Sequence, residues 1–551
     1  MKTGIGHSFA AASFLLSGRN KRQACERSVE ILAQGRITRA AGIIVAASII
    51  SKLLGVVRER VIAVNFGAGM VTDAYLVALT IPNIIILLAT EAVTAGYLPV
   101  FASLLARRRE KEAGRVAGSL TAITAVLLAG LSLTGIILAP ALVRLVAPNF
   151  TPDAAAAAVY LSRIIFPVIF FMSLGAVFTV TLQSLQHFTV PALAPLAMNA
   201  AIIAVVALGG SRYGGVSLAF GTLLGMGLQA AIQLPQLLRL MRQRGIPFAL
   251  KAADPQVREV GRLSLPVVGR TLVMQAYTLV ERMLASGLAA GSIASLNFAN
   301  KLMQLPYGVF ATAVTTAIFP TLSEQAARDA KEEMAGTLLH GVRTVALIIL
   351  PAMVGLIVLR VPIVRLVFEQ GAFDAAATQA TAAALLYYSL GLAGHAGNLV
   401  LTRAFFALHD TMTPLKLSFA TTGMTAVAAV ILVRPLQHGG LALANSLGVL
   451  TATGLLYYNL KRLLPQLDSR GLLYSLGKIG LASLLMGGAV SGLALTPPVA
   501  RLLAAGPLAG TVLLIAAGGF TYFLALLLLR VEELAWLLAL LRQRRPGRRG
   551  A

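Results

Sequence analysis

The sequence predicts an all-α polytopic membrane protein with about 14 transmembrane helices. Of its 551 residues, 57% are hydrophobic and only 12% are charged, whereas a soluble domain carries about 25% charged residues. The mean hydropathy is +0.82. Apolar runs recur from residue 39 to residue 530, and each is long enough for the roughly 20 residues that a helix needs to cross a bilayer. These observations exclude an ordinary soluble fold.

The expected helices follow one another along the chain with short polar connections between them. Their approximate centres lie near residues 50, 85, 126, 170, 200, 226, 275, 308, 348, 390, 424, 450, 484 and 517. Prolines such as Pro82 and Pro351 fall inside these runs, and membrane helices tolerate such breaks because neighbouring groups satisfy the freed backbone atoms.

Basic residues predict how the helices are oriented. They follow the second, sixth, eighth and twelfth expected spans, within residues 107–115, 239–262, 328–343 and 461–470, and they crowd both chain ends. Because Lys and Arg concentrate in cytoplasmic loops, we expect a multi-pass protein of the bacterial cytoplasmic (inner) membrane with both termini cytoplasmic. Basic cytosolic tails would cover residues 1–38 and 531–551. The same bias explains the formal net charge of +25 without a nucleic-acid partner.

Sequence landmarks recur at a nearly constant offset of 221 to 223 residues. Glu59-Arg60 returns as Glu281-Arg282, PALVRLV from Pro140 returns as PIVRLV from Pro362, and the segment that ends at Pro191 returns as one that ends at Pro414. Chance similarity in an Ala/Leu-rich chain is the alternative, but several pairs in the same order favour a repeat. Each copy would hold six spans, an even number, so the copies would be parallel repeats of the kind found in secondary transporters.

The repeat predicts three membrane units. We expect an N-terminal six-helix lobe over residues 39–250, a C-terminal six-helix lobe over residues 255–465, and an extra helix pair over residues 470–530. The basic segment over residues 242–262 would link the two lobes.

Four charged residues lie inside the first expected span: Lys52, Arg58, Glu59 and Arg60. At 100° per residue, Lys52 and Glu59 nearly eclipse each other, so one lipid-facing orientation cannot hide all four. A charge at mid-bilayer costs at least about 2.5 to 3.5 kcal/mol, and such residues normally face a bundle interior or a watery cavity. The alternative is that Arg58 to Arg60 snorkel to an interface. The equivalent Glu281-Arg282 in the matching helix favours a cavity.

Further polar candidates lie in neighbouring spans. They are Asp73 after the FGAG turn, Asn83 at the Pro82-Asn83 break, Glu91, Arg270 and Lys301. Asp73 has an equally simple interpretation as a carboxylate at a helix start, favoured by the helix dipole. Cations outnumber acids in this set, so the cavity should prefer an anionic ligand, and phosphate is the obvious class.

The sequence shows no catalytic machinery. The nearest string to a phosphate-binding loop, GLLYSLGKIG, has the wrong spacing and lacks the required Ser or Thr. Six scattered histidines form no metalloprotease motif, and the lone Cys25 excludes an internal disulfide or a CxxC site. We therefore expect a transporter with no cofactor and no metal, and not an enzyme.

Several strings resemble the MurJ (MviN) lipid II flippase family of the multidrug/oligosaccharidyl-lipid/polysaccharide (MOP) exporter superfamily. They are SKLLGVVRERVIAVNFGAGMVTDAYLVALTIPN, LAAGSIASLNFANKLMQLPYGVFATAVTTAIFPTLSE, RLVFEQGAF and RAFFALHDTMTP. The resemblance implies fourteen helices in two six-helix lobes around a central cationic cavity. This cavity would accept the pyrophosphate and sugar-peptide head of an undecaprenyl-linked peptidoglycan precursor, with the lipid tail along a groove made by the extra pair.

The resemblance also implies roles for particular residues. The basic cavity residues of the family fall on Lys52, Arg58 and Lys301, and its acidic residues fall on Glu59, Asp73 and Glu91. This chain has lysine where the family has arginine at 52 and 301, and Ile86-Leu87 where relatives carry arginine. Lysine keeps the charge and loses the bidentate fork.

The function expected from this resemblance is export of lipid II by alternating access for cell-wall synthesis. Lys52, Arg58, Lys301 and Arg270 would bind the substrate, while Glu59, Asp73, Glu91, Asn83, Glu281 and Arg282 would partner those cations or latch a gate. Membrane potential or an ion gradient would supply the energy. The alternatives are a sibling exporter of another polyprenyl-linked glycan or of drugs, and a non-transporting scaffold that binds cell-wall synthesis enzymes.

Overall fold

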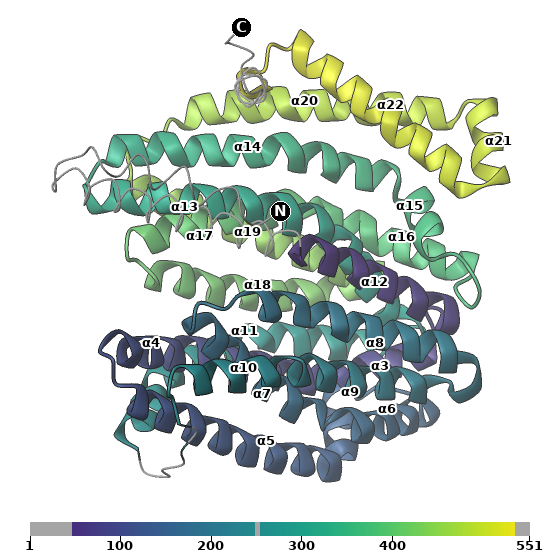
Figure 1. Cartoon of the computed structure of the whole chain (residues 1–551). Coiled ribbons are helices and arrows are strands. Elements are labelled where there is room, and N and C mark those ends of the chain that lie inside the picture. Colours follow the sequence, from purple (N-terminus) through teal and green to yellow (C-terminus); the bar gives the residue numbers. More distant parts are fainter. Residues whose placement is uncertain (1–46, 248, 250–253, 535–551) are drawn as a thin grey trace, which may run out of the picture.

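The computed structural model describes residues 47–247, 249 and 254–534. Within these residues the chain is built of helices and has no strand, which confirms the all-α fold class. Figure 1 shows the helices as two stacked bodies, the N-terminal lobe below and the C-terminal lobe with the extra helix pair above. The predicted tail over residues 1–38, most of the tail over residues 531–551, and Cys25 lie outside the described residues.

The N-terminal lobe begins with a helix over residues 47–66, called the first helix below. The helices after it are α3 (Met70–Ala92), the π-helix η1 (Val93–Tyr97), α4 (Leu98–Ala106), α5 (Glu110–Val146), α6 (Pro152–Ile165), α7 (Val168–Ser184), α8 (Thr189–Tyr213), α9 (Gly215–Ala231) and α10 (Gln233–Gln243).

The C-terminal lobe repeats this order. Its helices are α11 (Pro255–Ala285), α12 (Ser292–Pro306), the π-helix η2 (Tyr307–Ala311), α13 (Thr312–Ala327), α14 (Lys331–Val358), α15 (Arg360–Phe368), α16 (Ala375–Leu390), α17 (Leu392–Ala407), α18 (Met412–Leu436) and α19 (His438–Leu463). The extra pair follows as α20 (Ser469–Ala494) and α22 (Pro507–Leu528), joined by the short α21 (Pro497–Ala505).

The described residues contain 11 helices that are long and apolar enough to span a membrane, or 12 if the bent pair α6 and α7 is one span. The predicted number of about 14 stays a prediction. The first helix reaches the edge of the described residues, and α16 and α17 have 16 residues each. These two are too short to cross a bilayer singly, because a spanning helix needs about 20 residues.

Equivalent helices of the two lobes begin about 222 residues apart. Met70 starts α3 and Ser292 starts α12, while Glu110 starts α5 and Lys331 starts α14. The spacing of the helices therefore matches the offset of the repeated sequence landmarks. The predicted limits of the two lobes stay a prediction, and α11 packs against α3 of the first lobe as well as α18 of its own.

Capping residues repeat with the helices that they start. Thr151 accepts a hydrogen bond from Ala154 N (3.4 Å) at the start of α6, and Asp374 accepts one from Ala377 N (2.7 Å) at the start of α16. Ser, Thr and Asp are favoured at this position because their side-chain oxygens satisfy otherwise free amides of the first turn. The same local chemistry therefore begins the same helix in both lobes.

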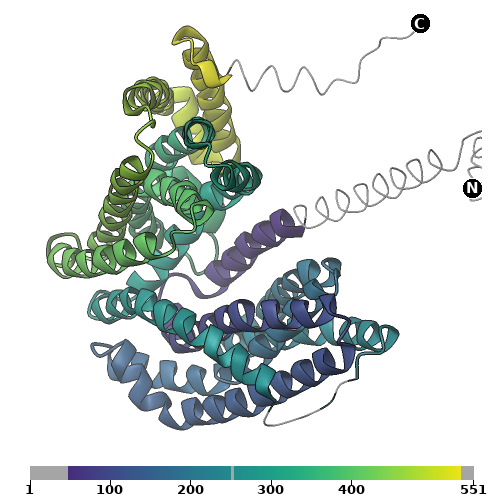
Figure 2. The same ribbon diagram turned by 90° about the vertical axis from the view of Figure 1, so that its left-hand side faces the viewer.

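The lobes touch at one end of the molecule, near the loops that join α15 to α16 and α11 to α12. Ala372 N donates to Val64 O at 2.8 Å, which ties the second lobe to the first helix. Gly291 has a φ of 89° and lies against the Ala68 carbonyl, so a side chain there would meet both backbone strain and a clash. Figure 2 shows the two bodies diverging from this end, with the first helix between them.

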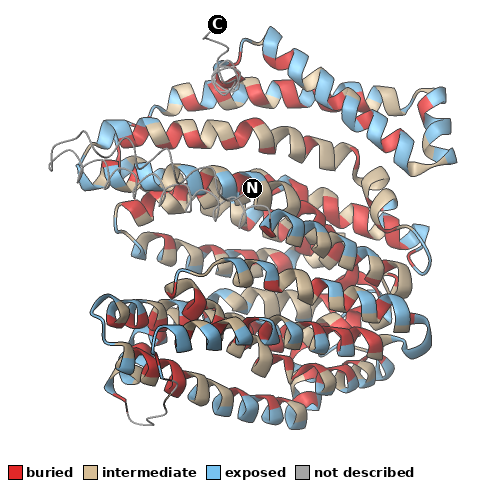
Figure 3. Cartoon of the chain, in the orientation of Figure 1, coloured by how far each residue is buried: buried red, intermediate tan, exposed pale blue. Residues whose placement is uncertain are grey.

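Large apolar side chains cover the outside of the molecule. Exposed residues lie along outer helices such as α5 and α22 (Figure 3), and Leu208 is 86% exposed. Such exposure is normal where lipid, not water, surrounds a helix. Small and aromatic buried side chains from both lobes form one large core that includes Ala74, Ile293 and Phe298.

Candidate functional site

Two adjoining cavities lie along the first helix between the lobes. The central cavity has a volume of about 360 Å³, and the inner cavity has a volume of about 240 Å³. Arg58, Glu59 and Lys301 line both of them, so these three residues form the boundary between the cavities. Lys52 lines the central cavity and Asn83 lines the inner one. The structure thus brings five of the predicted site residues together.

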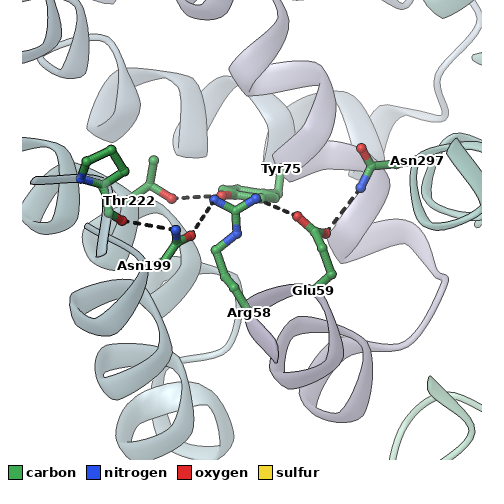
Figure 4. A network of polar contacts seen from close by, with 7 residues as sticks. Arg58, Glu59, Tyr75, Asn199, Thr222 and Asn297 are labelled. Carbon is green, nitrogen blue, oxygen red and sulfur yellow. Dashed lines mark hydrogen bonds and ion pairs between the residues drawn. The ribbon is translucent and has the colours of Figure 1, made fainter. Parts of the chain in front are cut away.

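Arg58 and Glu59 are the centre of a hydrogen-bond network that connects the lobes (Figure 4). Arg58 Nη2 donates to Glu59 Oε1 at 2.6 Å, and Arg58 Nη1 donates to Asn199 Oδ1 of α8 at 3.2 Å. On the other side, Asn297 Nδ2 of α12 donates to Glu59 Oε2 at 3.3 Å. Glu59 is buried, and a buried carboxylate is stable only when it is paired and hydrogen-bonded in this way.

The two lysines of the central cavity are held differently. Lys52 Nζ donates to the carbonyl of Gly308 in the π-helix η2, which links the first helix to the C-terminal lobe. Among the residues that the structure describes, the Lys301 ammonium has neither a hydrogen-bond nor an ion-pair partner. With Lys52, Arg58 and Lys301 set against Glu59 alone, the walls of the central cavity are net cationic. An anion that entered would find a free ammonium group.

Asp73 lies at the end where the lobes touch and not in these cavities. Its carboxylate accepts hydrogen bonds from Gly291 N (2.6 Å) and Ala294 N (2.7 Å) at the start of α12. Asp73 is in the first turn of α3, as expected for a carboxylate at a helix start, but the amides it binds belong to the other lobe. A carboxylate at a helix N-terminus satisfies free amides and is favoured by the helix dipole.

Four other predicted site residues line neither cavity. Arg270 Nη2 of α11 lies 3.9 Å from Glu91 Oε2 of α3, and both side chains are about 40% exposed. Glu281 accepts a hydrogen bond from the hydroxyl of Tyr388 at 2.9 Å. Arg282, beside it, has buried Nε and Nη1 atoms without hydrogen-bond partners.

The Ile86-Leu87 departure falls on packed apolar residues. Ile86 is buried in the large core, and neither Ile86 nor Leu87 lines the two cavities. The cationic character of the described site therefore comes from Lys52, Arg58 and Lys301.

Sequence analysis missed the neutral polar members of the site. Asn199, Asn297 and Tyr75 complete the network, and Tyr75 shares a hydrogen bond with Thr222 at 2.7 Å. A signal was available, because Asn297 and Lys301 are four residues apart and so share one face of an otherwise apolar helix. The described residues contain no group of three or more His, Cys, Asp or Glu side chains that could hold a metal ion. The absence of a cofactor stays a prediction.

Similar proteins share this chain's sequence over most of its length. The family model described as lipid II flippase MurJ matches residues 62–497. The lipid II flippase MurJ of Burkholderia cenocepacia is 29% identical over 75% of this chain and 82% of its own length. The probable lipid II flippase MurJ of Rhizobium meliloti is 30% identical over 72% of this chain and 75% of its own length.

Solved structures share the fold. A lipid II flippase MurJ in an inward closed conformation superposes with a TM-score of 0.75 at 23% identity, covering 88% of this chain and 97% of that one. An inward-facing multidrug resistance MATE transporter of the MOP superfamily superposes with a TM-score of 0.66 at 16% identity, covering 78% of this chain and 100% of that one. The family match over most of the sequence confirms the resemblance, and the chain belongs to the lipid II flippase MurJ family.

Proposed function

We propose that this protein moves lipid II from the inner to the outer leaflet of the cytoplasmic membrane for cell-wall synthesis. The observation that carries the proposal is the central cavity, where three cations border a space of about 360 Å³ and only one carboxylate opposes them. The names of the relatives supply the substrate, since those proteins are flippases of lipid II. Members of this family are transporters and not enzymes in the usual sense.

The diphosphate of the substrate would bind Lys52, Arg58 and Lys301. Arginine and lysine form strong charge-assisted hydrogen bonds with phosphate oxygens. An incoming diphosphate would take the free Lys301 ammonium first and then compete with the Gly308 carbonyl for Lys52. It would also neutralise the cationic walls, which lowers the free energy required to close the cavity away from water.

The described state is inward-facing under this proposal. The lobe contacts at Val64, Asp73 and Gly291 lie at the end opposite the basic loops that follow α4 and α13. Basic loops favour the cytoplasm, so the closed end would face outward and both termini would be cytoplasmic. Alternating access would then require the Asp73 hydrogen bonds to break while the basic ends of the lobes approach each other.

The prenyl tail would lie against the extra helix pair. An apolar cavity of about 320 Å³ separates α14 from α20 and α22, and its lining includes Gly355, Ile363, Met486, Val490 and Leu514. Burial of hydrocarbon in such a groove is favourable by about 0.8 kcal/mol per CH₂ group relative to water. The groove thus suits a long isoprenoid chain better than the polar cavities do.

Energy coupling and partners are part of the same proposal. Membrane potential is worth about 2.3 kcal/mol per elementary charge per 100 mV, so movement of an anionic headgroup outward would be driven directly by an inside-negative potential. An ion gradient is the other source. Membrane lipids surround the protein, and cell-wall synthesis enzymes would receive the product.

Depletion of the protein tests the proposal. Cells that lose it should accumulate lipid II on the inner leaflet, measured by labelling of the leaflet-accessible headgroup. Accumulation of a different polyprenyl-linked glycan would show a sibling exporter instead. Complementation with Lys52→Glu should fail at a normal membrane level, because the reversed charge repels the diphosphate. Normal growth with that variant would contradict the cavity mechanism, whereas failure of transport at normal abundance argues against a scaffold.

A further inference from the structure

A third cavity continues the track along the first helix toward the basic end of the molecule. This outer cavity has a volume of about 380 Å³ and is lined by Ser48, Ser51, Lys52, Gln183, Phe188, Pro191, Ala192 and Pro195. Lys52 lines both the outer and the central cavity. From Ser48 to Ile62, which lines the inner cavity, the helix advances about 21 Å at about 1.5 Å per residue. The three cavities therefore follow one another on a single helix face.

Helix α8 forms the opposite wall of the same track. Pro191 and Pro195 line the outer cavity, Asn199 binds Arg58, and Ile202 lines the inner cavity. These residues are spaced by three or four positions and so share one face of α8. A ligand anchored at Lys52 and Arg58 thus reaches the outer cavity without leaving this track.

The outer cavity differs from the other two in charge. Lys52 is its only charged residue, at the border with the central cavity, and it has no carboxylate. Two hydroxyls and one carboxamide supply its side-chain polar groups, from Ser48, Ser51 and Gln183. This chemistry suits a neutral group with many hydroxyls and amides that is attached to an anion.

The polar groups of the outer cavity are also free to bind. Among the described residues, the side chains of Ser48, Ser51 and Gln183 have no hydrogen-bond partner. In the inner cavity, by contrast, Thr72 donates to Gly67 O at 2.8 Å, and Tyr75 is bonded to Thr222. Donors and acceptors that are already satisfied add little to ligand binding, whereas unpaired ones in a cavity wall can bind without breaking an internal bond.

Apolar faces complete the pocket. Phe188 presents an aromatic ring, and Pro191 and Pro195 present saturated rings. Ligand pockets of about 300 to 1,000 Å³ typically combine such faces with a few polar groups that fix orientation. A pyranose has the matching surfaces, with an apolar C–H face and a polar rim of hydroxyl and acetamido groups.

We propose that the outer cavity is the subsite for the first neutral sugar of the lipid-linked glycan, with Gln183, Ser48 and Ser51 as hydrogen-bonding partners and Phe188 as the packing face. The inference rests on the proposed function, because it requires the diphosphate at the central cavity. The first sugar is bonded directly to the distal phosphate, so it must lie beside the cation that holds this phosphate. Lys52 is the residue that meets this requirement, since it borders both cavities.

Binding of two lipids to the purified full chain in nanodiscs tests the subsite. The probes are undecaprenyl diphosphate, which has no sugar, and lipid II. Gln183→Leu, Ser51→Ala and Phe188→Ala should each weaken lipid II binding about threefold to tenfold, as expected for loss of one hydrogen bond or packing contact. Binding of undecaprenyl diphosphate should change less than about twofold. Matched controls are Gln243→Leu on α10 and Phe220→Ala on α9, which are exposed and line none of the three cavities.

The outcomes separate this inference from the proposed function. Equal losses for both probes, or no loss for lipid II with any of the three variants, would overturn the sugar subsite. Arg58→Gln should weaken both probes, because it removes a diphosphate contact. Failure of the unmodified protein to bind either lipid would refute the proposed function and the subsite together.

Discussion

The first helix and α11 are repeat equivalents, yet they place the same acidic residue in different surroundings. Glu59 borders the central and inner cavities and accepts hydrogen bonds from Arg58 and Asn297. Its equivalent Glu281, 222 residues later, accepts a hydrogen bond from Tyr388 and lines none of the three cavities on the first helix.

The neighbouring positions explain the difference. Where the first helix has Lys52 and Arg58, α11 has Met274 and Val280. Where α12 has Lys301, the equivalent α3 has Leu79, which lines the inner cavity. The duplication therefore supplies a symmetric helical frame, while a few substitutions concentrate the cations on the first helix of one lobe and the second helix of the other.

The largest effect should come from Arg58→Ala. It removes a diphosphate contact and leaves the buried Glu59 without its ion-pair partner, and breaking a buried pair typically costs about 3 to 5 kcal/mol. We expect loss of transport and a much lower thermal unfolding temperature. The double variant Arg58→Gln/Glu59→Gln should recover most of the stability but not lipid binding. Recovery of both would show that Arg58 serves the fold alone.

Asp73→Asn should come next, with its main effect on the balance between conformations. The neutral side chain weakens the charge-assisted bonds to Gly291 N and Ala294 N, for which about 1 to 3 kcal/mol is expected. Spin labels at Arg108 and Arg328, on the basic ends of the two lobes, should move closer as the lobe contact opens. The control Asp374→Asn alters a cap within one lobe and should leave that distance unchanged. An unchanged distance in Asp73→Asn would contradict the gate role.

Glu281→Gln should have a smaller effect than Glu59→Gln. An amide oxygen can still accept the Tyr388 hydrogen bond, so we expect a stability loss of at most about 1 kcal/mol and unchanged lipid binding. Glu59→Gln leaves Arg58 without its ionic partner beside the substrate space, and it should alter the affinity for undecaprenyl diphosphate. Equal effects of the two variants on that affinity would break the asymmetry between the lobes.

The sequence was enough to predict the helical class, the repeat and the cationic set, because membrane helices and buried charges follow strong local rules. It could not predict how Glu281 and Arg270 would be oriented. Their contacts with Tyr388 and Glu91 join helices far apart in the chain, and the choice between cavity and interior depends on tertiary packing. Asn199 was missed for the same reason, since a single amide in an apolar span gains its meaning from Arg58.

The smallest expected effect is a gain of affinity from Lys52→Arg. The guanidinium group keeps the charge and adds a planar fork that can bind phosphate with two parallel hydrogen bonds, whereas the ammonium group acts as a point charge. We expect undecaprenyl diphosphate to bind about two to five times more tightly, a change of less than about 1 kcal/mol, as measured by titration in nanodiscs. Lys461→Arg is the matched control, because Lys461 lies near the end of α19 and contacts the carbonyl of Leu467 instead of the cavities. Weaker binding by Lys52→Arg would mean that the reach of the lysine to Gly308 matters more than its charge, and would place Lys52 in the contact between the lobes instead of the diphosphate site.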